Sequence, residues 1–257
     1  MYGGKLTINE IAERKFDVAY FPIASLEQHG PHLPTTTDMI ITHALAVKIA
    51  TNLNAFMLPV QPFGTNYEHA GDRFSIGLDA DIIYEMVLDI ALELKRQGFK
   101  KLVIHQGSAG LRVLYPLTRH LNAVEGIKTV ILKPFELWEN DSVLSTAGNV
   151  HACEAETSLM LYIDEKSVRK DKINNIDFVP EVSVRYLDFK ALTAICANGV
   201  WGNPSHATKE KGRMLFEKSV EACTRHINEA FAFMDRIGDY TGGREEEYLR
   251  VTYSAHT

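Results

Sequence analysis

The alternation of short apolar runs with longer amphipathic ones constrains the fold of this chain most. Buried strands are expected at 18–23 (VAYFPI), 55–60, 102–105 and 127–132, and an outlying strand at 182–187. Helical spacing of apolar residues is found at 39–53, 79–97, 154–163 and 209–237, and in a stretch that ends near Leu121. Because strands that alternate with helices form βαβ units, the pattern predicts an α/β fold whose mainly parallel sheet is covered on both faces.

The length, net charge and cysteine content limit the class of protein. The 257 residues contain no internal repeat and no Gly/Ser-rich linker, so a single domain over residues 1–257 is expected. A net charge of −6 argues against nucleic acid as a partner, since phosphate binding needs a basic excess. The three cysteines form no C-x-x-C pair, and no apolar run is long enough for a membrane span. We therefore expect a cytoplasmic protein with no membrane partner.

The first cluster of candidate functional residues follows the strand at 18–23. Glu27 and His29 stand two apart, and in extended backbone such residues point to the same side. The Gly-Pro and Leu-Pro steps at 30–34 then favour a rigid turn, and Asp38 stands at the expected N-cap of the next helix. Carboxylate and imidazole suit zinc, manganese or iron. The cluster predicts a metal site, although a polar loop with a helix cap is the structural alternative.

A second cluster leads into the helix at 154–163. His151 lies just outside this helix, where an imidazole suits proton transfer near neutral pH. Glu154 fits the first turn of the helix, where the helix dipole favours an acid. Glu156 is predicted to point toward the sheet ends, where burial is costly for a carboxylate unless it meets a cation. Helix stabilisation alone is the alternative for Glu156, and a packing or hydrogen-bonding role is the alternative for His151.

Both clusters resemble signatures of the creatininase (creatinine amidohydrolase) family. Residues 24–34 (ASLEQHGPHLP), with Asp38 after them, are similar to the family's G-S-x-E-Q-H-G-P-H-L-P signature. Residues 151–158 (HACEAETS) are similar to its H-A-G-x-x-E-T-S signature. Weaker matches stand at 64–69 (GTNYEH) and 199–204 (GVWGNP).

The resemblance implies a three-layer α/β/α sandwich, assembled as a homo-oligomer, usually a hexamer. It implies one or two divalent metals per chain, with zinc as the first choice and manganese or iron as alternatives. The implied reaction is hydrolysis of an amide-type C–N bond in a small, often cyclic, molecule by metal-activated water. Glu27, His29 and Asp38 are then metal ligands, Glu156 is a further ligand or a supporting carboxylate, and His151 is the proton-transfer residue.

One stretch departs from the family pattern. After the third strand the family has N-G-H-G-G-N, whose histidine is a metal ligand, whereas this chain has QGSAGL at 106–111. Ser108 stands at the ligand position, and His105, three residues earlier, is the candidate replacement. Creatininases place a glutamate two residues after that histidine, and here the position is Gly110. The departure argues against creatinine as the substrate.

Other residues are expected to bind substrate. Besides Ser108, we expect Glu68, His69 and Trp201 to line the pocket, with a loop hydrogen bond or ordinary packing as the alternative for each. Three alternative functions remain open. The chain could be a ring-opening C–C hydrolase of a cyclic diketone such as a diketo-inositol, as in some relatives. The turn at 106–110 could be a nucleophile elbow of a serine hydrolase that uses Ser108, or the chain could be a non-catalytic small-molecule-binding relic.

Overall fold

The computed structural model describes residues 3–138 and 141–238. Its sheet has the strand order β2-β1-β3-β4, and every neighbouring pair is parallel. The bounds are Val18–Ile23 for β1, Phe56–Met57 for β2, Lys101–Gln106 for β3 and Lys128–Leu132 for β4. The mainly parallel sheet predicted from the sequence is thus confirmed. β2 is shorter than predicted because, after the Leu58 N–H, the next hydrogen bond to β1 comes from the Gln61 N–H, one residue beyond the regular parallel register.

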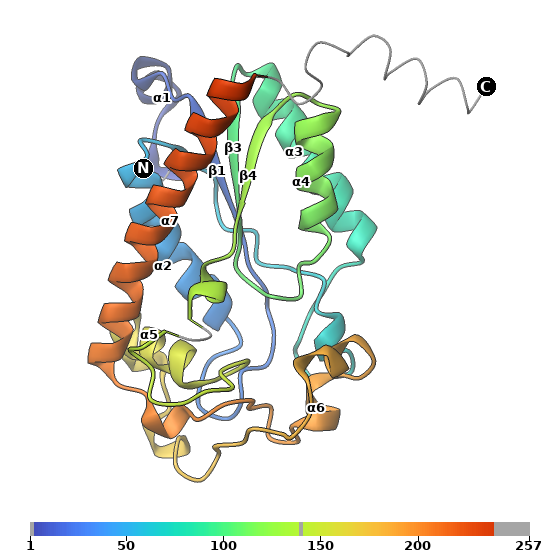
Figure 1. Cartoon of the computed structure of the whole chain (residues 1–257), viewed down its shortest axis with the longest axis vertical. Coiled ribbons are helices and arrows are strands. Elements are labelled where there is room, and N and C mark those ends of the chain that lie inside the picture. The colour runs from blue at the N-terminus through green and yellow to red at the C-terminus, as the bar shows by residue number, and fades with distance from the viewer. Residues whose placement is uncertain (1–2, 139–140, 239–257) are drawn as a thin grey trace, which may run out of the picture.

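Helices cover both faces of the sheet (Figure 1). α2 and α7 lie on one face, where α5 packs against them, and α3 and α4 lie on the other. The three-layer α/β/α sandwich is thus confirmed. The helix bounds are Ile8–Arg14 for α1, Thr37–Asn52 for α2, Ala80–Arg96 for α3, Leu114–Ala123 for α4, Glu154–Ile163 for α5, Leu192–Ile195 for α6 and Lys209–Ile237 for α7.

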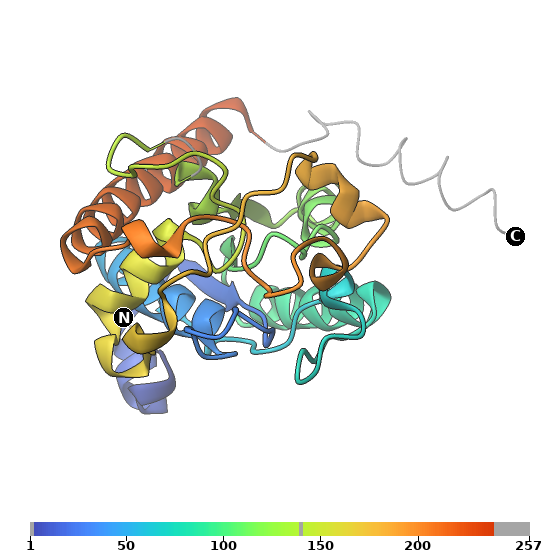
Figure 2. The ribbon, with the colours of Figure 1, turned by 90° about the horizontal axis from the view of Figure 1, so that it is seen from below.

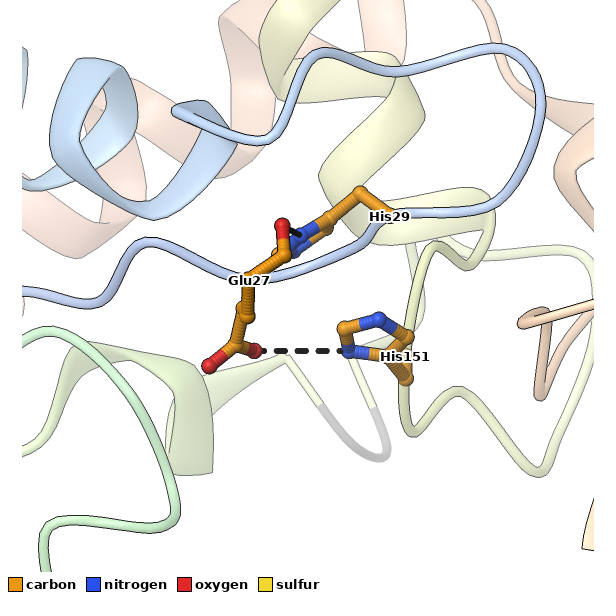
Figure 3. A group of neighbouring side chains, drawn as sticks. All are labelled: Glu27, His29 and His151. Atoms are coloured by element: carbon orange, nitrogen blue, oxygen red, sulfur yellow. Dashed lines mark hydrogen bonds and ion pairs between the residues drawn. The ribbon is translucent and has the colours of Figure 1, made fainter. Parts of the chain in front are cut away.

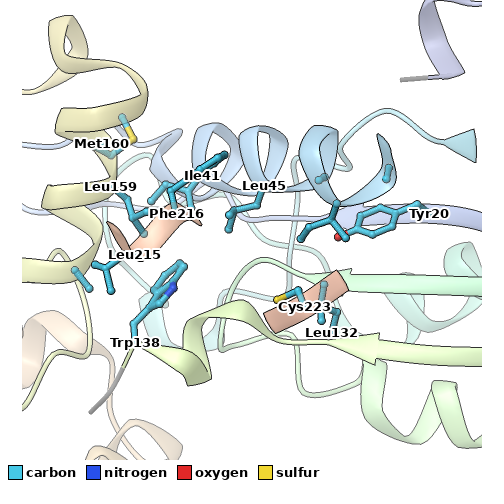
Figure 4. Close-up of a cluster of buried hydrophobic side chains, with 14 of the residues drawn as sticks. Tyr20, Ile41, Leu45, Leu132, Trp138, Leu159, Met160, Leu215, Phe216 and Cys223 are labelled. Carbon is cyan, nitrogen blue, oxygen red and sulfur yellow. The ribbon is translucent and has the colours of Figure 1, made fainter. Parts of the chain in front are cut away.

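The strands divide the core by the alternation of their side chains. Tyr20 of β1 and Val103 of β3 face α2, α5 and α7, and the residues before and after them face α3 and α4. The first of these cores is the larger and contains Leu45, Trp138 and Phe216 (Figure 4). Because both faces of each strand are buried, the strand segments of the sequence are continuously apolar and do not alternate between apolar and polar residues.

Two local predictions were wrong. Residues 182–187 do not form a strand: Val184–Asp188 is a 3₁₀ helix, capped by the Ser183 side chain, which accepts a hydrogen bond from the Arg185 N–H. Asp38 is not the N-cap of α2, because Thr36 holds that position and Asp38 lies in the first helical turn, buried. This shift turns its carboxylate away from helix capping and toward the interior.

The topology creates a crevice at one end of the sheet. The chain leaves β1 for β2 through α2 on one face, and leaves β3 for β4 through α4 on the other. β1 and β3 are neighbours, so their carboxyl ends mark the switch point where α/β proteins bind ligands. α5 and α6 lie beyond this end (Figure 1), which the connecting segments cross in the view from below (Figure 2). Among the described helices, none combines the length and apolarity needed to cross a membrane.

Candidate metal site

The loop after β1 folds back on itself and brings Asp38 to the predicted pair. Gly30 has a φ of 63°, and a Cβ at this position would lie 2.7 Å from Val200 Cγ2, so a side chain is excluded twice over. The Glu27 N–H donates to the Thr35 carbonyl at 3.1 Å, which closes the loop. As a result, the side chains of Glu27, His29 and Asp38 are all buried at the crevice.

His29 turns one ring nitrogen toward two carboxylates. Its Nδ1 lies 3.3 Å from the Glu27 carbonyl oxygen, and because a carbonyl only accepts, Nδ1 carries the proton. Nε2 then faces Asp38 Oδ1 at 3.2 Å and Glu156 Oε1 at 3.6 Å. His29 Nε2 and Asp38 Oδ2 are buried without a hydrogen-bond partner. A ring nitrogen and two carboxylates that converge in this way are suited to hold a cation, either a proton on Nε2 or a metal ion that replaces it.

The electrostatics of His29, Asp38 and Glu156 also favour a cation at this place. Burial lowers the pKa of His29, but the Asp38 and Glu156 carboxylates outweigh it and raise that pKa well above its usual value. Burial and the nearby charge of Glu27 raise the pKa of Asp38 to about 7. The group therefore holds positive charge firmly, and the same electrostatics favour a divalent metal.

Glu27 joins this group to two further imidazoles. Its Oε1 lies 3.2 Å from His69 Nε2 and 3.7 Å from His151 Nδ1 (Figure 3). The Ser25 hydroxyl donates a hydrogen bond to Oε2 and fixes the carboxylate. Burial raises the pKa of Glu27, but the charge and the hydrogen bond of His69, with the charge of His29, hold it well below its usual range. Glu27 is thus an ionised acceptor at the centre of the site.

His151 is held in one tautomer. Its Nε2 lies 2.7 Å from the Gln28 carbonyl oxygen, so Nε2 carries the proton and the Nδ1 lone pair faces Glu27. Its backbone pairs with Trp201 through N–H to carbonyl bonds of 3.0 and 2.9 Å. Burial, with the charges of His29 and His69, lowers the pKa of His151 to about 3. His151 is thus a neutral imidazole whose Nδ1 lone pair faces the crevice.

Glu68 and His69 enter the site from the 3₁₀ turn Tyr67–His69. His69 Nδ1 donates to Asp72 Oδ2 at 3.1 Å, and the Thr193 hydroxyl in turn donates to Asp72 Oδ1. This pair fixes the His69 ring with Nε2 toward Glu27. Burial lowers the pKa of His69, but the Glu27 carboxylate outweighs it and raises that pKa to about 9. Both residues, predicted to bind substrate, therefore lie beside the predicted metal ligands.

The structure places His105 and Ser108 apart from these contacts. His105 is the second-last residue of β3 and lies on the face of Val103 and Tyr20, and its Nδ1 lies 2.9 Å from the Tyr20 hydroxyl. Its pKa is lowered to about 3 by burial. Ser108 lies in the cavity wall, and no hydrogen bond joins its hydroxyl to a histidine within the described part of the chain. The ligand role of His105 stays a prediction.

The described side chains form three overlapping groups of potential metal ligands. In each group the donor atoms lie within 4.8 Å of one another. The groups are Glu27–His29–His151, Glu27–Glu68–His69 and His29–Asp38–Glu156. The chain thus has a possible His/Glu metal site, and the unpartnered nitrogen of His29 and oxygen of Asp38 show that its donors fit a divalent cation.

A cavity of about 610 Å³ opens onto these side chains. Its wall includes Glu27, Asp38, Glu68, His69, His105, Ser108, His151 and Glu156. Apolar side chains complete it, among them Ile41, Leu45, Phe135, Trp138, Leu187 and Leu192. Trp201, predicted to bind substrate, is not part of this wall. It packs against Leu192 and Cys196 and supports the backbone of His151 instead.

Sequence reasoning missed the residues that orient the site. Ser25, Gln28 and Asp72 fix Glu27, His151 and His69 respectively. Only the spacing of His69 and Asp72, three apart in a turn, offered a local signal. Glu154 lies in the first turn of α5, as predicted, and its carboxylate also accepts hydrogen bonds from Ser145 and Thr146.

Taken together, the parallel three-layer fold and the buried carboxylate–imidazole cluster at its switch point define the class of α/β metallohydrolases. The creatininase family model, described as creatinine amidohydrolase, matches residues 4–227. The chain therefore belongs to the creatininase family, whose members are metal-dependent amidohydrolases, and it is an enzyme of that kind.

Similar proteins agree with this assignment. The mycofactocin precursor peptide peptidase of Mycobacterium ulcerans (strain Agy99) is 26% identical over 216 residues, which are 80% of this chain and 82% of that protein. The 2-amino-5-formylamino-6-ribosylaminopyrimidin-4(3H)-one 5'-monophosphate deformylase of Methanothermus fervidus is 31% identical over 183 residues, 68% of each chain. A solved mutant creatininase superposes with a TM-score of 0.77 at 25% identity, covering 90% of this chain and 98% of its own.

Proposed function

We propose that this enzyme hydrolyses an amide-type C–N bond of a small, open-chain or cyclic substrate at a divalent metal held by Glu27, His29, Asp38 and Glu156. One observation carries the proposal. His29 Nε2 faces oxygens of two carboxylates at 3.2 and 3.6 Å, and both this nitrogen and Asp38 Oδ2 are buried without a hydrogen-bond partner. Carboxylate and imidazole donors favour zinc, with manganese and iron as alternatives.

The residues around the donors suit this reaction. A bound divalent metal supplies charge that lowers the pKa of water toward neutrality and polarises a carbonyl oxygen. His151 Nδ1 accepts the proton of the attacking water and returns it to the leaving nitrogen. Gln28 holds the opposite ring nitrogen at 2.7 Å, so the ring keeps its orientation, and Glu27, 3.7 Å away, stabilises the imidazolium.

The cavity limits the class of substrate. Its volume of about 610 Å³ fits a small molecule or a short peptide end, and its apolar wall favours a substrate with a flat or apolar portion. The peptidase and the deformylase among the relatives both have names that imply an amide-type bond. The amide-type bond is therefore the common chemical feature to test first.

A hydrolysis screen with metal control tests the proposal. Purified enzyme would be assayed on lactams, cyclic ureides, formamides and short peptides, with cyclic diketones as the probe for C–C hydrolysis. We expect turnover of one amide class that is lost after EDTA treatment and restored by zinc or manganese. Full activity in the metal-free protein would contradict the proposal, and turnover confined to the diketones would replace the amide class with the C–C alternative.

Substitution of the turn serine separates the metal mechanism from a serine nucleophile. We expect S108A to lose no more than about tenfold in kcat/KM, the effect of one substrate hydrogen bond. Removal of a true serine nucleophile costs about 10⁶-fold. A loss of that size, with metal content unchanged, would favour the nucleophile elbow at 106–110.

We also propose that the chain assembles as a homo-oligomer, a hexamer by its family resemblance. Apolar side chains lie exposed along one segment before and within the start of α3, which supports a covered surface. They are Tyr67, Phe74, Ile76 and Ile82, each more than half exposed. Light scattering after gel filtration would give the assembly mass, and a monomer at all concentrations tested would contradict this proposal.

A further inference from the structure

His105 borders the cavity and has a hydrogen bond at only one of its ring nitrogens. Its Nδ1 lies 2.9 Å from the Tyr20 hydroxyl. No hydrogen bond in the described part of the chain reaches its Nε2, yet this nitrogen is not enclosed by protein as His29 Nε2 is. Since the cavity is the space that His105 borders, Nε2 is the ring nitrogen that a bound molecule can reach.

Tyr20 fixes which nitrogen of this ring carries the proton. Its side chain is fully buried, and its hydroxyl has no other hydrogen-bond partner among the described residues. If Nδ1 of His105 donated to the hydroxyl, the hydroxyl proton itself would be buried without an acceptor, which costs free energy. If the hydroxyl donates to Nδ1, no buried proton is left over. The Tyr20 hydroxyl is therefore the donor, and the proton of the neutral ring lies on Nε2.

Burial keeps both groups in these protonation states. It lowers the pKa of His105 to about 3, so the ring is neutral at neutral pH. It raises the pKa of Tyr20 well above its usual value, so the hydroxyl keeps the proton that it donates. A ring in this state presents an N–H to the cavity and no lone pair, so it donates a hydrogen bond there and does not bind a metal.

The cavity wall on the side of His105 is otherwise apolar. His105 projects on the face of the sheet that Val103 also faces, and there the wall includes Ile41, Leu45 and Trp138. A single N–H in an apolar wall selects strongly, because a molecule without an acceptor leaves this donor unpaired.

We propose that His105 is a substrate-binding residue whose Nε2–H donates a hydrogen bond to a carbonyl oxygen or an unprotonated ring nitrogen of the substrate, and that Tyr20 positions this proton. This role rests on the proposed function, because the acceptor belongs to the amide substrate. His105 makes none of the contacts of the metal-ligand cluster in the described residues. The acceptor therefore lies apart from the bond that is cleaved, and the substrate class is an amide with a second, uncharged acceptor.

Nitrogen-15 NMR of the labelled protein tests the tautomer without a substrate. A ring nitrogen with a proton and one without differ widely in chemical shift, and comparison with H105M assigns the signals of His105. We expect the proton on Nε2 and none on Nδ1, in both the metal-free and the zinc-loaded protein, and a mixture of tautomers in Y20F. Y84F is the matched control, because the Tyr84 hydroxyl bonds to His120 Nδ1 at 2.7 Å away from the cavity wall, and it leaves the His105 signals unchanged.

Kinetics on the best substrate of the hydrolysis screen test the role of the N–H. H105M has no donor, and we expect it to lose about 10–100-fold in kcat/KM with metal content and circular dichroism unchanged. H105Q keeps an N–H donor and is expected to lose less than about threefold, and Y84F is expected to match wild type.

Three results would overturn this role of His105 alone: wild-type kcat/KM in H105M, loss of metal from H105M, which would make His105 a ligand, and a bare Nε2 in the spectra of active wild type. A wild type without metal-dependent amide turnover would overturn the proposed function as well.

Discussion

Glu154 offers a sharp test of how the segment that carries His151 is held. Its side chain is fully buried. Its carboxylate accepts from the Ser145 N–H at 2.9 Å, the Thr146 N–H at 3.0 Å and the Thr146 hydroxyl at 2.6 Å, and it pairs with Lys211 of α7. The substitution E154Q keeps the shape of the side chain but removes its charge and turns one acceptor into a donor.

The expected cost follows from burial. Breaking a buried ion pair costs about 3–5 kcal/mol, because the remaining partner is left without compensation. Lys211 is 19% exposed, so water reaches it, and we expect the lower end, about 3 kcal/mol. E165Q is the matched control, because Glu165 pairs with Lys170 and Lys209 at the surface, where water and salt weaken an ion pair, so we expect little change in stability.

Urea unfolding at several pH values completes the test. Burial raises the pKa of Glu154, but its bonds from Lys211 and Thr146 lower it overall. Since the folded pKa lies below the unfolded one, the stabilisation is present above about pH 4.5 and is lost as the pH falls through the folded value. The difference between wild type and E154Q therefore narrows in acid. A difference below about 1 kcal/mol at neutral pH, or one that does not change in acid, would refute the reasoning.

Three further predictions concern packing, catalysis and metal. We expect urea unfolding to show that G212A is destabilised by about 1–3 kcal/mol, because the new Cβ would lie 1.8 Å from the Ser158 carbonyl oxygen and this clash outweighs the better helix propensity of alanine. N228A, at an exposed position of the same helix, is the control, and we expect its stability to be unchanged or slightly higher. H151A lowers kcat by about 10²–10⁴-fold with metal content unchanged, and a loss of metal would instead make His151 a ligand. Removing the metal with a chelator lowers the free energy of unfolding by about 4 kcal/mol, compared with protein in free zinc at about a thousand times the dissociation constant of the site. An unchanged melting temperature would contradict a buried ion.

Much of the fold could be predicted because its signals are local. Apolar runs between amphipathic helices defined the parallel sheet and both covering layers. The error at 182–187 arose because Val182, Val184 and Tyr186 alternate as in a strand, yet no strand in the described part of the chain pairs with them, and each side chain is exposed. Pairing partners, unlike periodicity, are set by tertiary contacts that a single sequence does not show.

The candidate site was predictable only in part for the same reason. Glu27, His29 and Asp38 come from one short loop, so spacing was enough to propose that they meet. Glu68 reaches the cluster only because position 110, 42 residues later, lacks a side chain. Such a relation between distant residues is visible only in three dimensions.

A crystal structure of the zinc-loaded protein, with anomalous diffraction at the zinc edge, tests the central claim most directly. We predict an anomalous peak for zinc about 2.0–2.2 Å from His29 Nε2 and from an oxygen of Asp38, with Glu156 as a further ligand. A fully loaded crystal whose zinc lies elsewhere, with His29 and Asp38 still facing each other without an ion, would contradict it.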